Sequence, residues 1–395
     1  MAFKKASVRD ADVSGRRVLV RVDFNVPLEG GEVADDTRIR AALPTIQLLT
    51  DRGARVVLAS HLGRPKGKPD PELSLRPAAD HLAELLDREV KLAPAVAGPE
   101  VERMADSLDD GEILLLENTR FEPGETTDDP GLAQALANLA DVFVNDAFGA
   151  AHRSHASTAG VAKLLPAYAG LLLEKEVANL ESVADDPARP LVVILGGAKV
   201  SDKVGVIDRF IELADQILIG GAMIFPFFKA EGHDIGGSLC AEDDVPLARK
   251  ALDKADASDC ELVLPTDLVL GREFSAETEI EELDGVDVPE GWMGLDVGPA
   301  SASDYAARVA GAGTVLWNGP MGAFELDPFA AGTSKVAEAV AAAPGFTVVG
   351  GGDSVAALVK FGLTDDVNWV STGGGASLEL LEGKTLPGVA ALNDN

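Results

Sequence analysis

The sequence predicts an α/β protein of two domains, each built on a doubly wound, mostly parallel sheet. Short runs of Val, Ile and Leu alternate with longer stretches of helical character along the chain, which is the pattern of successive βα units. The 395 residues exceed what one hydrophobic core holds comfortably, so two domains are expected. Hydrophobic residues make up 46% of the chain and aromatic residues only 5%, so aliphatic side chains must fill the interiors, as in buried parallel strands.

The first half of the chain contains four predicted strands with predicted helices between them. Each strand is a short apolar run that ends in polar or glycine-containing sequence. The strands are Arg17–Phe24, Ala54–Ser60, Glu112–Glu117 and Asp141–Asp146. The helices are Ile39–Arg52, Pro77–Glu89 and Gly131–Ala140.

The second half follows the same plan after a connecting helix. Gly170–Val183 has apolar residues at helical spacing, with Glu and Lys placed for local ion pairs, and the polar stretch Ala184–Pro190 follows it. We interpret these segments as an interdomain helix and a domain boundary. The strands predicted beyond the boundary are Leu191–Leu195, Gln216–Ile219, Glu261–Pro265, Thr314–Trp317, Thr347–Val349 and Asn368–Ser371.

The charge of the chain limits its partners. Lys and Arg number 34 against 65 Asp and Glu, which gives a formal net charge of −31. Binding to nucleic acid or to anionic lipid needs a positive face, so we expect neither as a partner. Solubility is the simplest role for the acidity.

Cysteine and histidine usage favours a reducing cytoplasm and no dedicated metal cage. Cys240 and Cys260 cannot form a disulfide framework, and we expect no signal peptide or membrane span, because no apolar run is long enough. His152 and His155 could either bind a metal from a helix or face an anion from a turn. No carboxylate or cysteine lies at a matching spacing.

Cationic side chains lie at or just after each predicted strand of the first half. Any one of them could be a surface charge or a structural ion-pair partner. Together, in so acidic a chain, they indicate a basic site for a small polyanion, because guanidinium groups bind phosphate and carboxylate with two hydrogen bonds. Asp23 and Asn25 either end the first strand in a turn or bind substrate hydroxyl groups. The cationic residues are Arg21, His61, Arg64, Arg120 and Arg153, with Arg38 at the start of the first helix.

Glycines end most strands of the second half. Glycine lets the backbone approach phosphate closely, and a following helix offers free N–H groups. One glycine pair would be a tight turn, whereas several pairs with Lys and Asp nearby indicate a nucleotide site. Neither GxxxxGK[ST], nor a GxGxxG after a strand, nor the protein-kinase motif set is present, so spacing alone does not name the enzyme. The glycine segments are Gly196–Lys203, Gly220–Gly221, Asn318–Gly322, Gly350–Ser354 and Gly373–Gly375.

Nine long motifs, in order from residue 21 to residue 388, resemble those of phosphoglycerate kinase. Their length, number and order make the resemblance specific, and it covers nearly the whole chain. The motifs are RVDFNVP from Arg21, DTRIRAALPTI from Asp36, SHLGRP from Ser60, LLENTRFEPGE from Leu115, DAFGAAHRSHAST from Asp146, LGGAKVSDKVGVI from Leu195, LWNGPMGAFE from Leu316, GGGDS from Gly350 and STGGGASLELLEGKTLPG from Ser371.

This resemblance implies both a fold and a reaction. It implies two Rossmann-like domains that face each other across a cleft and are joined by a helix. A phosphoglycerate-binding domain would span residues 1–169 plus about 380–395, the helix 170–185 and a nucleotide-binding domain 186–379. The implied reaction is reversible phosphoryl transfer between 1,3-bisphosphoglycerate and ADP, giving 3-phosphoglycerate and ATP in glycolysis or gluconeogenesis, with Mg²⁺ as cofactor. The resemblance also implies a monomer.

The resemblance assigns a role to each matching residue. Residues that would hold the triose are Arg21, Asp23, Asn25, Arg38, His61, Arg64, Arg120 and Arg153. Residues that would hold the nucleotide are Gly197, Lys199, Lys203, Asn318, Glu325, Gly351, Gly352, Asp353 and Ser354, of which Asp353 would also bind Mg²⁺. The catalytic residues would be Arg38, Lys203, Gly373 and Gly374. The sequence departs from the family pattern at Gly220–Pro226, beside the expected nucleotide pocket.

The implied chemistry needs no general base, because the acceptor is a carboxylate that is ionised near neutral pH. Catalysis would rest on positioning and on neutralising the charge of the moving phosphoryl group. Ligands on two domains would have to meet, so we expect domain closure with Gly170–Val183 as a hinge element. Three alternatives stay open at this point: an NAD-dependent dehydrogenase, a non-catalytic relative, and a kinase of the same fold that acts on another small acid.

Overall fold

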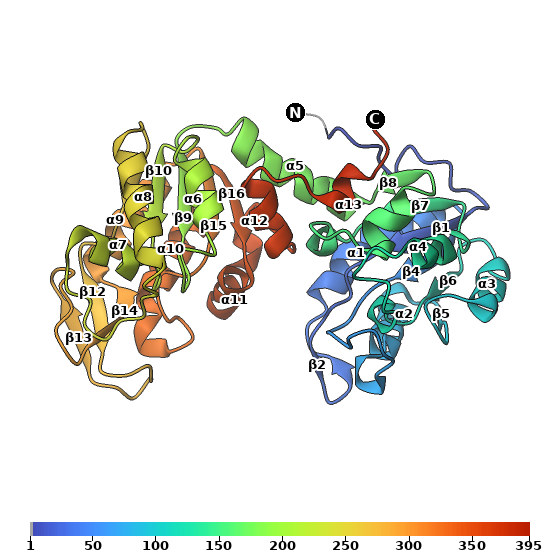
Figure 1. Cartoon of the computed structure of the whole chain (residues 1–395), viewed down its shortest axis with the longest axis horizontal. Helices are drawn as coiled ribbons and strands as arrows, with labels where there is room; N and C mark the ends of the chain where they lie inside the picture. Colours follow the sequence, from blue (N-terminus) through green and yellow to red (C-terminus); the bar gives the residue numbers. More distant parts are fainter. Residues whose placement is uncertain (1–2) are drawn as a thin grey trace. The chain divides into compact units, whose positions relative to one another are not determined.

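The computed structural model describes residues 3–395 as two compact units. The C-terminal unit holds Asn179–Gly383, and the N-terminal unit holds the residues up to Ala178 together with Lys384–Asn395. Each unit is built on a six-stranded, all-parallel sheet with helices around it (Figure 1). The predicted fold class is therefore confirmed.

The sheet of the N-terminal unit has the strand order β5-β6-β4-β1-β7-β8. Its strands are β1 (Arg17–Arg21), β4 (Arg55–Ala59), β5 (Val90–Leu92), β6 (Ile113–Leu115), β7 (Val142–Asn145) and β8 (Ala167–Ala169). The other elements of this unit are the hairpin β2 (Leu28–Glu29) and β3 (Glu32–Val33), and the helices α1 (Thr37–Asp51), α2 (Arg76–Leu86), α3 (Pro99–Asp106), α4 (Pro130–Ala137) and α13 (Pro387–Ala390).

Alternating strand residues bury both faces of this sheet. Val18 and Val20 of β1 share one core with Ile39 and Ile46 of α1, whose spacing places them on one side of the helix. Leu19 points to the opposite face and is also fully buried. Burial on both faces explains why the strands are continuous apolar runs rather than alternating ones.

The C-terminal unit has a larger set of elements. Its parallel sheet has the order β11-β10-β9-β15-β16-β17, and a second, antiparallel sheet has the order β13-β12-β14. The strands are β9 (Leu191–Leu195), β10 (Gln216–Ile219), β11 (Glu261–Val263), β12 (Leu268–Gly271), β13 (Ile280–Leu283), β14 (Met293–Val297), β15 (Thr314–Asn318), β16 (Phe346–Gly350) and β17 (Trp369–Val370). The helices are α6 (Val204–Phe210), α7 (Ile224–Glu231), α8 (Asp244–Asp256), α9 (Pro299–Ala310), α10 (Ala331–Ala341), α11 (Gly352–Phe361) and α12 (Gly375–Leu381).

Both sheets provide a binding crevice where their strand order reverses. In the C-terminal unit the chain moves outward in opposite directions from the neighbouring strands β9 and β15, whose last residues Leu195 and Asn318 pair in register. In the N-terminal unit β1 and β7 have the same relation, and Arg21 pairs with Asn145. Loops diverge at such points, so ligands of open α/β sheets bind there, beyond the carboxyl ends of the strands.

A helix, α5 (Leu171–Asp185), covers the segment predicted to connect the domains, and it contributes residues to both units. The strands predicted at Leu191–Leu195 and Gln216–Ile219 coincide with β9 and β10. Several strands were not predicted. The strands β5 and β8 have only three residues each, and β13 is a mostly exposed Ile-Glu-Glu-Leu that lacks an apolar run.

The C-terminal tail completes the N-terminal unit. Gly388 donates its N–H to the carbonyl of Ala151 at 2.8 Å and accepts from the amide of Asn145 at 2.9 Å. Further along, the carbonyl of Asn393 accepts from the N–H of Ala6 at 2.9 Å. The last residues are thus hydrogen-bonded to segments that begin and end the first half of the chain.

Within residues 3–395, no helix is both long and apolar enough to cross a lipid bilayer. The same residues contain no group of three or more His, Cys, Asp and Glu side chains that could hold a metal ion. His152 and His155 were predicted either to bind a metal or to face an anion. His152 accepts a hydrogen bond from Nε of Arg153 at 3.1 Å, and His155 is buried.

Candidate functional site

The cations that follow the strands of the N-terminal unit gather around one buried histidine. His61 follows β4, and the charges of Arg21, Arg38, Arg120 and Arg153 all act on it. The charge of Arg64 acts in turn on Arg120. The fold therefore brings together all six predicted cationic residues, which we call the basic cluster: Arg21, Arg38, His61, Arg64, Arg120 and Arg153.

Arg21, the last residue of β1, is the fully buried arginine of the basic cluster. Its Nε donates to the hydroxyl of Ser157 at 2.8 Å, one terminal nitrogen donates to the carbonyl of Val22, and the other lies 3.1 Å from Nδ1 of His61. Because arginine can only donate, Nδ1 of His61 must be the acceptor. The strand-end pattern found Arg21 but could not show that its side chain points inward.

His61 is held as a neutral donor. Burial, followed by the charges of the surrounding arginines, lowers the pKa of His61 well below its usual value. The neutral ring has its lone pair on Nδ1, facing Arg21, so its proton is on Nε2. His61 can thus donate a hydrogen bond to an anion without contributing a charge.

Arg38 lies in the first turn of α1, next to both polar residues that follow β1. It donates to the carbonyl of Asn25 at 2.9 Å and lies 3.5 Å from the carboxylate of Asp23. The amide oxygen of Asn25 accepts from the N–H of Gly63 at 2.8 Å, which fixes the loop that carries His61 and Arg64. Arg38 keeps 37% of its side chain exposed, so part of its guanidinium fork stays available to a ligand.

Three arginines of the cluster line a cavity of about 430 Å³. Arg64, Arg120 and Arg153 form its walls, together with Lys66, which sequence reasoning missed. Burial and the charges of its neighbours lower the pKa of Arg120 to about 10, and its Nε is buried without a hydrogen-bond partner. Mutual repulsion and an unused donor are the expected features of a site that binds an anion.

A second candidate site lies at the switch point of the C-terminal unit. Its cavity, of about 450 Å³, is lined by the turns that follow β9, β15 and β16. Lys203 directly precedes α6 there, and its Nζ donates to the side-chain oxygen of Asn318. Burial lowers the pKa of Lys203 to about 8, although the carboxylates of Asp202 and Asp353 oppose this shift. The amide nitrogen of Asn318 is buried without a hydrogen-bond partner, so its N–H groups are left to donate to a ligand.

Most predicted nucleotide residues line this cavity. The residues found there are Gly197, Lys199, Lys203, Asn318, Gly351, Gly352, Asp353, Ser354 and Gly374. Gly373 is buried beside it and donates its N–H to the hydroxyl of Ser371 at 3.2 Å. Ser354 accepts from the N–H of Gly319 at 2.5 Å and so fixes the turn after β15. Asp202 also lines the cavity and was not predicted.

Gly352, the first residue of α11, has no structural reason to be glycine. Its φ lies outside the left-handed region, and a Cβ there would have no atom within 4 Å. Glycine costs about 0.5–1 kcal/mol relative to alanine in a helix interior and less at this first position, and the open space beside Gly352 lets a ligand approach the backbone closely from the cavity. Gly351, by contrast, has φ +90° and would press a Cβ to 3.1 Å from Asn318, so the backbone itself requires that glycine.

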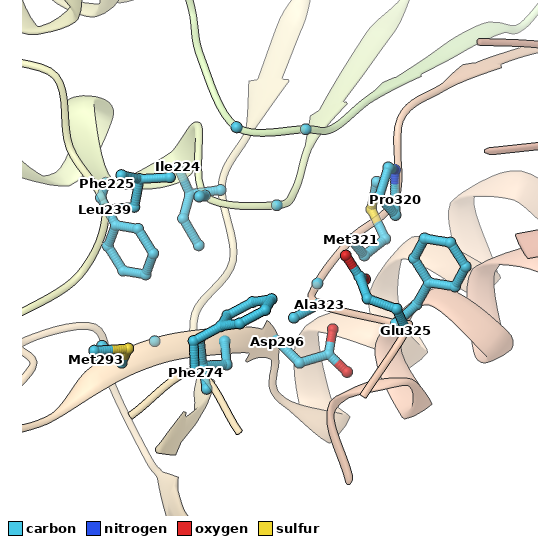
Figure 2. A pocket seen from close by; sticks show the side chains of 18 of the residues that line it. Ile224, Phe225, Leu239, Phe274, Met293, Asp296, Pro320, Met321, Ala323 and Glu325 are labelled. Carbon is cyan, nitrogen blue, oxygen red and sulfur yellow. The ribbon is translucent and has the colours of Figure 1, made fainter. Parts of the chain in front are cut away.

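A large apolar cavity of about 540 Å³ continues from the glycine-rich one. The two share Gly197, Ala198 and Asp353 in their linings. Figure 2 shows Phe225 and Leu239 on one side of the apolar cavity, Met321 and Glu325 on the other, and Phe274 with Asp296 below. Of these residues only Glu325 was predicted. The others come from a helix, a strand and separate loops, so no one local pattern joins them. An apolar slot joined to a glycine-lined polar one suits a nucleotide's base and phosphates.

Comparison with known proteins agrees with this geometry. The sequence model of the family described as phosphoglycerate kinase matches residues 8–384. The chain belongs to the phosphoglycerate kinase family. Curated phosphoglycerate kinases from Moorella thermoacetica and Roseiflexus castenholzii are 56% and 54% identical to it, each over 99% of both chains.

Solved phosphoglycerate kinase structures share its fold. The enzyme from Coxiella burnetii has a TM-score of 0.90 and 41% sequence identity, and the one from Pyrococcus horikoshii has 0.85 and 32%. Each comparison covers 98% of both chains. As a member of the phosphoglycerate kinase family the protein is a phosphotransferase, an ATP-binding kinase of glycolysis. The dehydrogenase alternative is thereby set aside.

Proposed function

We propose that the basic cluster binds 3-phosphoglycerate or 1,3-bisphosphoglycerate and that the two joined cavities of the C-terminal unit bind ADP or ATP. The observation that carries this assignment is the contrast between the two sites. One gathers five arginines around a neutral histidine, which suits a small polyanion. The other joins glycine turns to an apolar slot, which suits a nucleotide.

In the triose site, Arg38, Arg64, Arg120 and Arg153 would bind the anionic groups, and His61 would donate from Nε2. Arg21 is fully buried, so its role would be to hold His61 rather than to touch the substrate. Asp23 and Asn25 are both partly exposed beside Arg38 and could accept from the substrate hydroxyl and donate to its oxygens.

In the nucleotide site, the base would occupy the apolar cavity, and Glu325 at its edge would accept from the ribose hydroxyls. The phosphates would lie against Gly197, Gly351 and Gly352. Lys199 and Lys203 would supply positive charge there. Asn318 and Ser354 would fix the turns that carry these contacts.

Asp353 suits the role of magnesium ligand. Mg²⁺ with a nucleotide takes one or two carboxylates, and substrate phosphates and water fill the other positions. Asp353 is exposed in the first turn of α11, lines both cavities and has no cage of other acids around it within residues 3–395. When bound, the ion would neutralise phosphate charge.

The transfer itself would join a carboxylate oxygen of 3-phosphoglycerate to the γ-phosphorus of ATP while the bond to the ADP oxygen breaks. No proton has to move, because the carboxylate is already ionised. Arg38 and Lys203 would balance charge on the moving phosphoryl group, with the backbone of Gly373 and Gly374 beside it. Catalysis would thus depend on positioned cations rather than on an acid–base pair.

Steady-state turnover tests the proposed function. We expect ATP consumption that requires both 3-phosphoglycerate and Mg²⁺, followed as NADH loss with added glyceraldehyde-3-phosphate dehydrogenase. Folded protein that binds ATP without this turnover would contradict the proposal and would favour another acid substrate or a non-catalytic relative.

Gly352→Ala provides a test in which stability and activity change in opposite directions. We expect the free energy of unfolding to stay constant or rise by less than about 1 kcal/mol, because alanine favours the helix and the added Cβ meets nothing. We expect the KM for ATP to rise about tenfold or more, because the methyl group would occupy the phosphate side of the cavity. Denaturant unfolding and initial rates measure the two quantities. Gly362→Ala, at the other end of the same helix, is the control. Gly362 has φ +71°, so we expect alanine there to lower the free energy of unfolding and to leave the KM for ATP unchanged.

We also propose that the enzyme works as a cytoplasmic monomer. Its glycolytic role and its two unpaired cysteines, Cys240 and Cys260, support this location. Light scattering of the purified chain would test the monomer.

A further inference from the structure

A buried carboxylate lies behind the basic cluster, on the side away from solvent. Glu125 is fully buried, although it belongs to a loop of the protein and to none of the motif positions assigned to a ligand. A buried carboxylate is costly unless it is hydrogen-bonded and paired with a charge. Its partners therefore indicate what the residue does.

Glu125 is hydrogen-bonded to a single turn of the chain. Its two carboxylate oxygens accept from the hydroxyl of Ser157 at 2.5 Å and from the N–H of Ser157 at 3.0 Å. Its backbone carbonyl accepts from the N–H of Ala156 at 3.0 Å. Ser157 lies in a one-turn π-helix, Ala156–Gly160, a rare conformation that recurs at functional sites.

The serine passes this interaction on to Arg21. Because the Ser157 hydroxyl donates its one proton to Glu125, its lone pairs are left to accept, and it accepts from Nε of Arg21 at 2.8 Å. Arg21 then donates to Nδ1 of His61. Arg21 donates in both of these contacts because a guanidinium has no acceptor, so Glu125 and Ser157 act by fixing where the guanidinium lies against His61.

The charge of Glu125 acts on two arginines of the basic cluster, Arg21 and Arg120. The nearby His155 lies 3.8 Å from the carboxylate, but burial lowers the pKa of His155 to about 4, so it is neutral at physiological pH. Arg21 is fully buried, and the charges of Glu125 and Asp23 oppose the effect of that burial on its pKa. Glu125 thus compensates the cluster from within and leaves its exposed side free for a substrate anion.

We propose that Glu125 and Ser157 are positioning residues for the triose reaction: through Arg21 they fix His61 as an Nε2–H donor toward the substrate. Glu125 also ties the segment after Arg120 to the turn that follows Arg153, so it sets the spacing of two more cluster arginines. The substrate part of this inference rests on the proposed function. The state of the His61 ring does not, and it can be measured in the ligand-free protein.

The first measurement is the side-chain ¹⁵N spectrum of the full-length protein, which has only five histidines. In the unmodified chain we expect His61 Nδ1 to be unprotonated and Nε2 protonated. In Glu125→Gln and in Ser157→Ala we expect Arg21 to move away from Nδ1, so that the His61 ring shows a mixture of tautomers. The His61 pattern of the unmodified protein in both variants would overturn the proposal.

The second measurement is steady-state kinetics of the same variants. We expect the KM for 3-phosphoglycerate to rise at least tenfold and the KM for ATP to stay within twofold, because the nucleotide site belongs to the other unit. The double variant should lose no more than the worse single variant, since both changes interrupt one chain of contacts. Glu112→Gln is the matched control: it removes a carboxylate that precedes β6, at the amino end of the same sheet, and should leave both KM values unchanged.

Each remaining outcome is informative. A loss of thermal stability without a specific change in the KM for 3-phosphoglycerate would make Glu125 merely structural and would overturn the positioning role. If Glu125→Gln does not fold, Ser157→Ala removes a single oxygen and carries the same test. In a last outcome, the His61 tautomer changes as expected while Arg38→Ala and Arg153→Ala, each made singly, leave the kcat and the KM for 3-phosphoglycerate unchanged. In that case the triose assignment is wrong, and the contacts from Glu125 to His61 are still supported.

Discussion

Arg38→Ala is expected to lower kcat by about 10³-fold and to change the KM for 3-phosphoglycerate by less than about tenfold. The expectation follows from the geometry of the residue. The carbonyl of Asn25 takes one N–H of its guanidinium, and the side chain is 37% exposed. The free part of the fork is thus available for charge that develops during transfer.

Initial rates over a matrix of both substrate concentrations measure this effect. Arg40→Ala is the matched control, because Arg40 lies on the same helix and pairs with Asp36, four residues before it. We expect that variant to keep at least half of the kcat. A rise in KM with an unchanged kcat for Arg38→Ala would show that the residue binds the ground state and would remove it from the catalytic set.

Lys203→Met is expected to lower kcat by about 10²- to 10³-fold, which is typical for the loss of one donor to a transition-state charge. The variant should be at least as stable as the unmodified protein, because burial already disfavours the charged amine. Lys250→Met, which removes an exposed lysine paired with Asp208, should leave the rate unchanged. An inactive but destabilised Lys203→Met would leave the assignment without support.

The pH dependence of the unmodified enzyme gives a second measurement of the same residue. Because the pKa of Lys203 is about 8 in the folded protein, its charge is lost as the pH rises through that value. We therefore expect kcat/KM for the nucleotide to fall above pH 8. Bound phosphate would raise this pKa, so kcat itself should fall at a higher pH. Between pH 8 and about 10.4 the unfolded chain binds the extra proton, so this lysine makes stability increase with pH there, and Lys203→Met should remove that slope.

Sequence reasoning located the parts of the sites that belong to continuous segments. A strand such as β9 is a run of five buried aliphatic residues followed by glycine, so both the strand and the turn are visible in the sequence. The cations of the basic cluster were visible for the same reason, because parallel strands end at one edge of a sheet. Which of them a ligand could reach was not visible: Arg21 and Arg38 look alike in the sequence, yet Arg21 is fully buried and Arg38 is partly exposed.

Other parts depend on tertiary contacts that leave no local pattern. Phe225 of α7 lines the apolar cavity together with Leu239 and Phe274 of two separate loops, and each could equally have been an ordinary core or surface residue. Glu125 resembles a solvent-exposed loop acid in the sequence. Only its hydrogen bonds to Ser157 show that it is buried behind the cluster.

The return of the C-terminal tail to the N-terminal unit has a consequence for biosynthesis. The first 178 residues leave the ribosome early, but their structure includes hydrogen bonds to Gly388 and Asn393. At about 5–20 residues per second, the 205 residues of Asn179–Gly383 take roughly 10–40 s to be made. During that time the nascent N-terminal unit lacks its closing segment. A ribosome stalled before Lys384 should therefore hold this unit in a protease-sensitive state, even though nearly all of its core has already been synthesised.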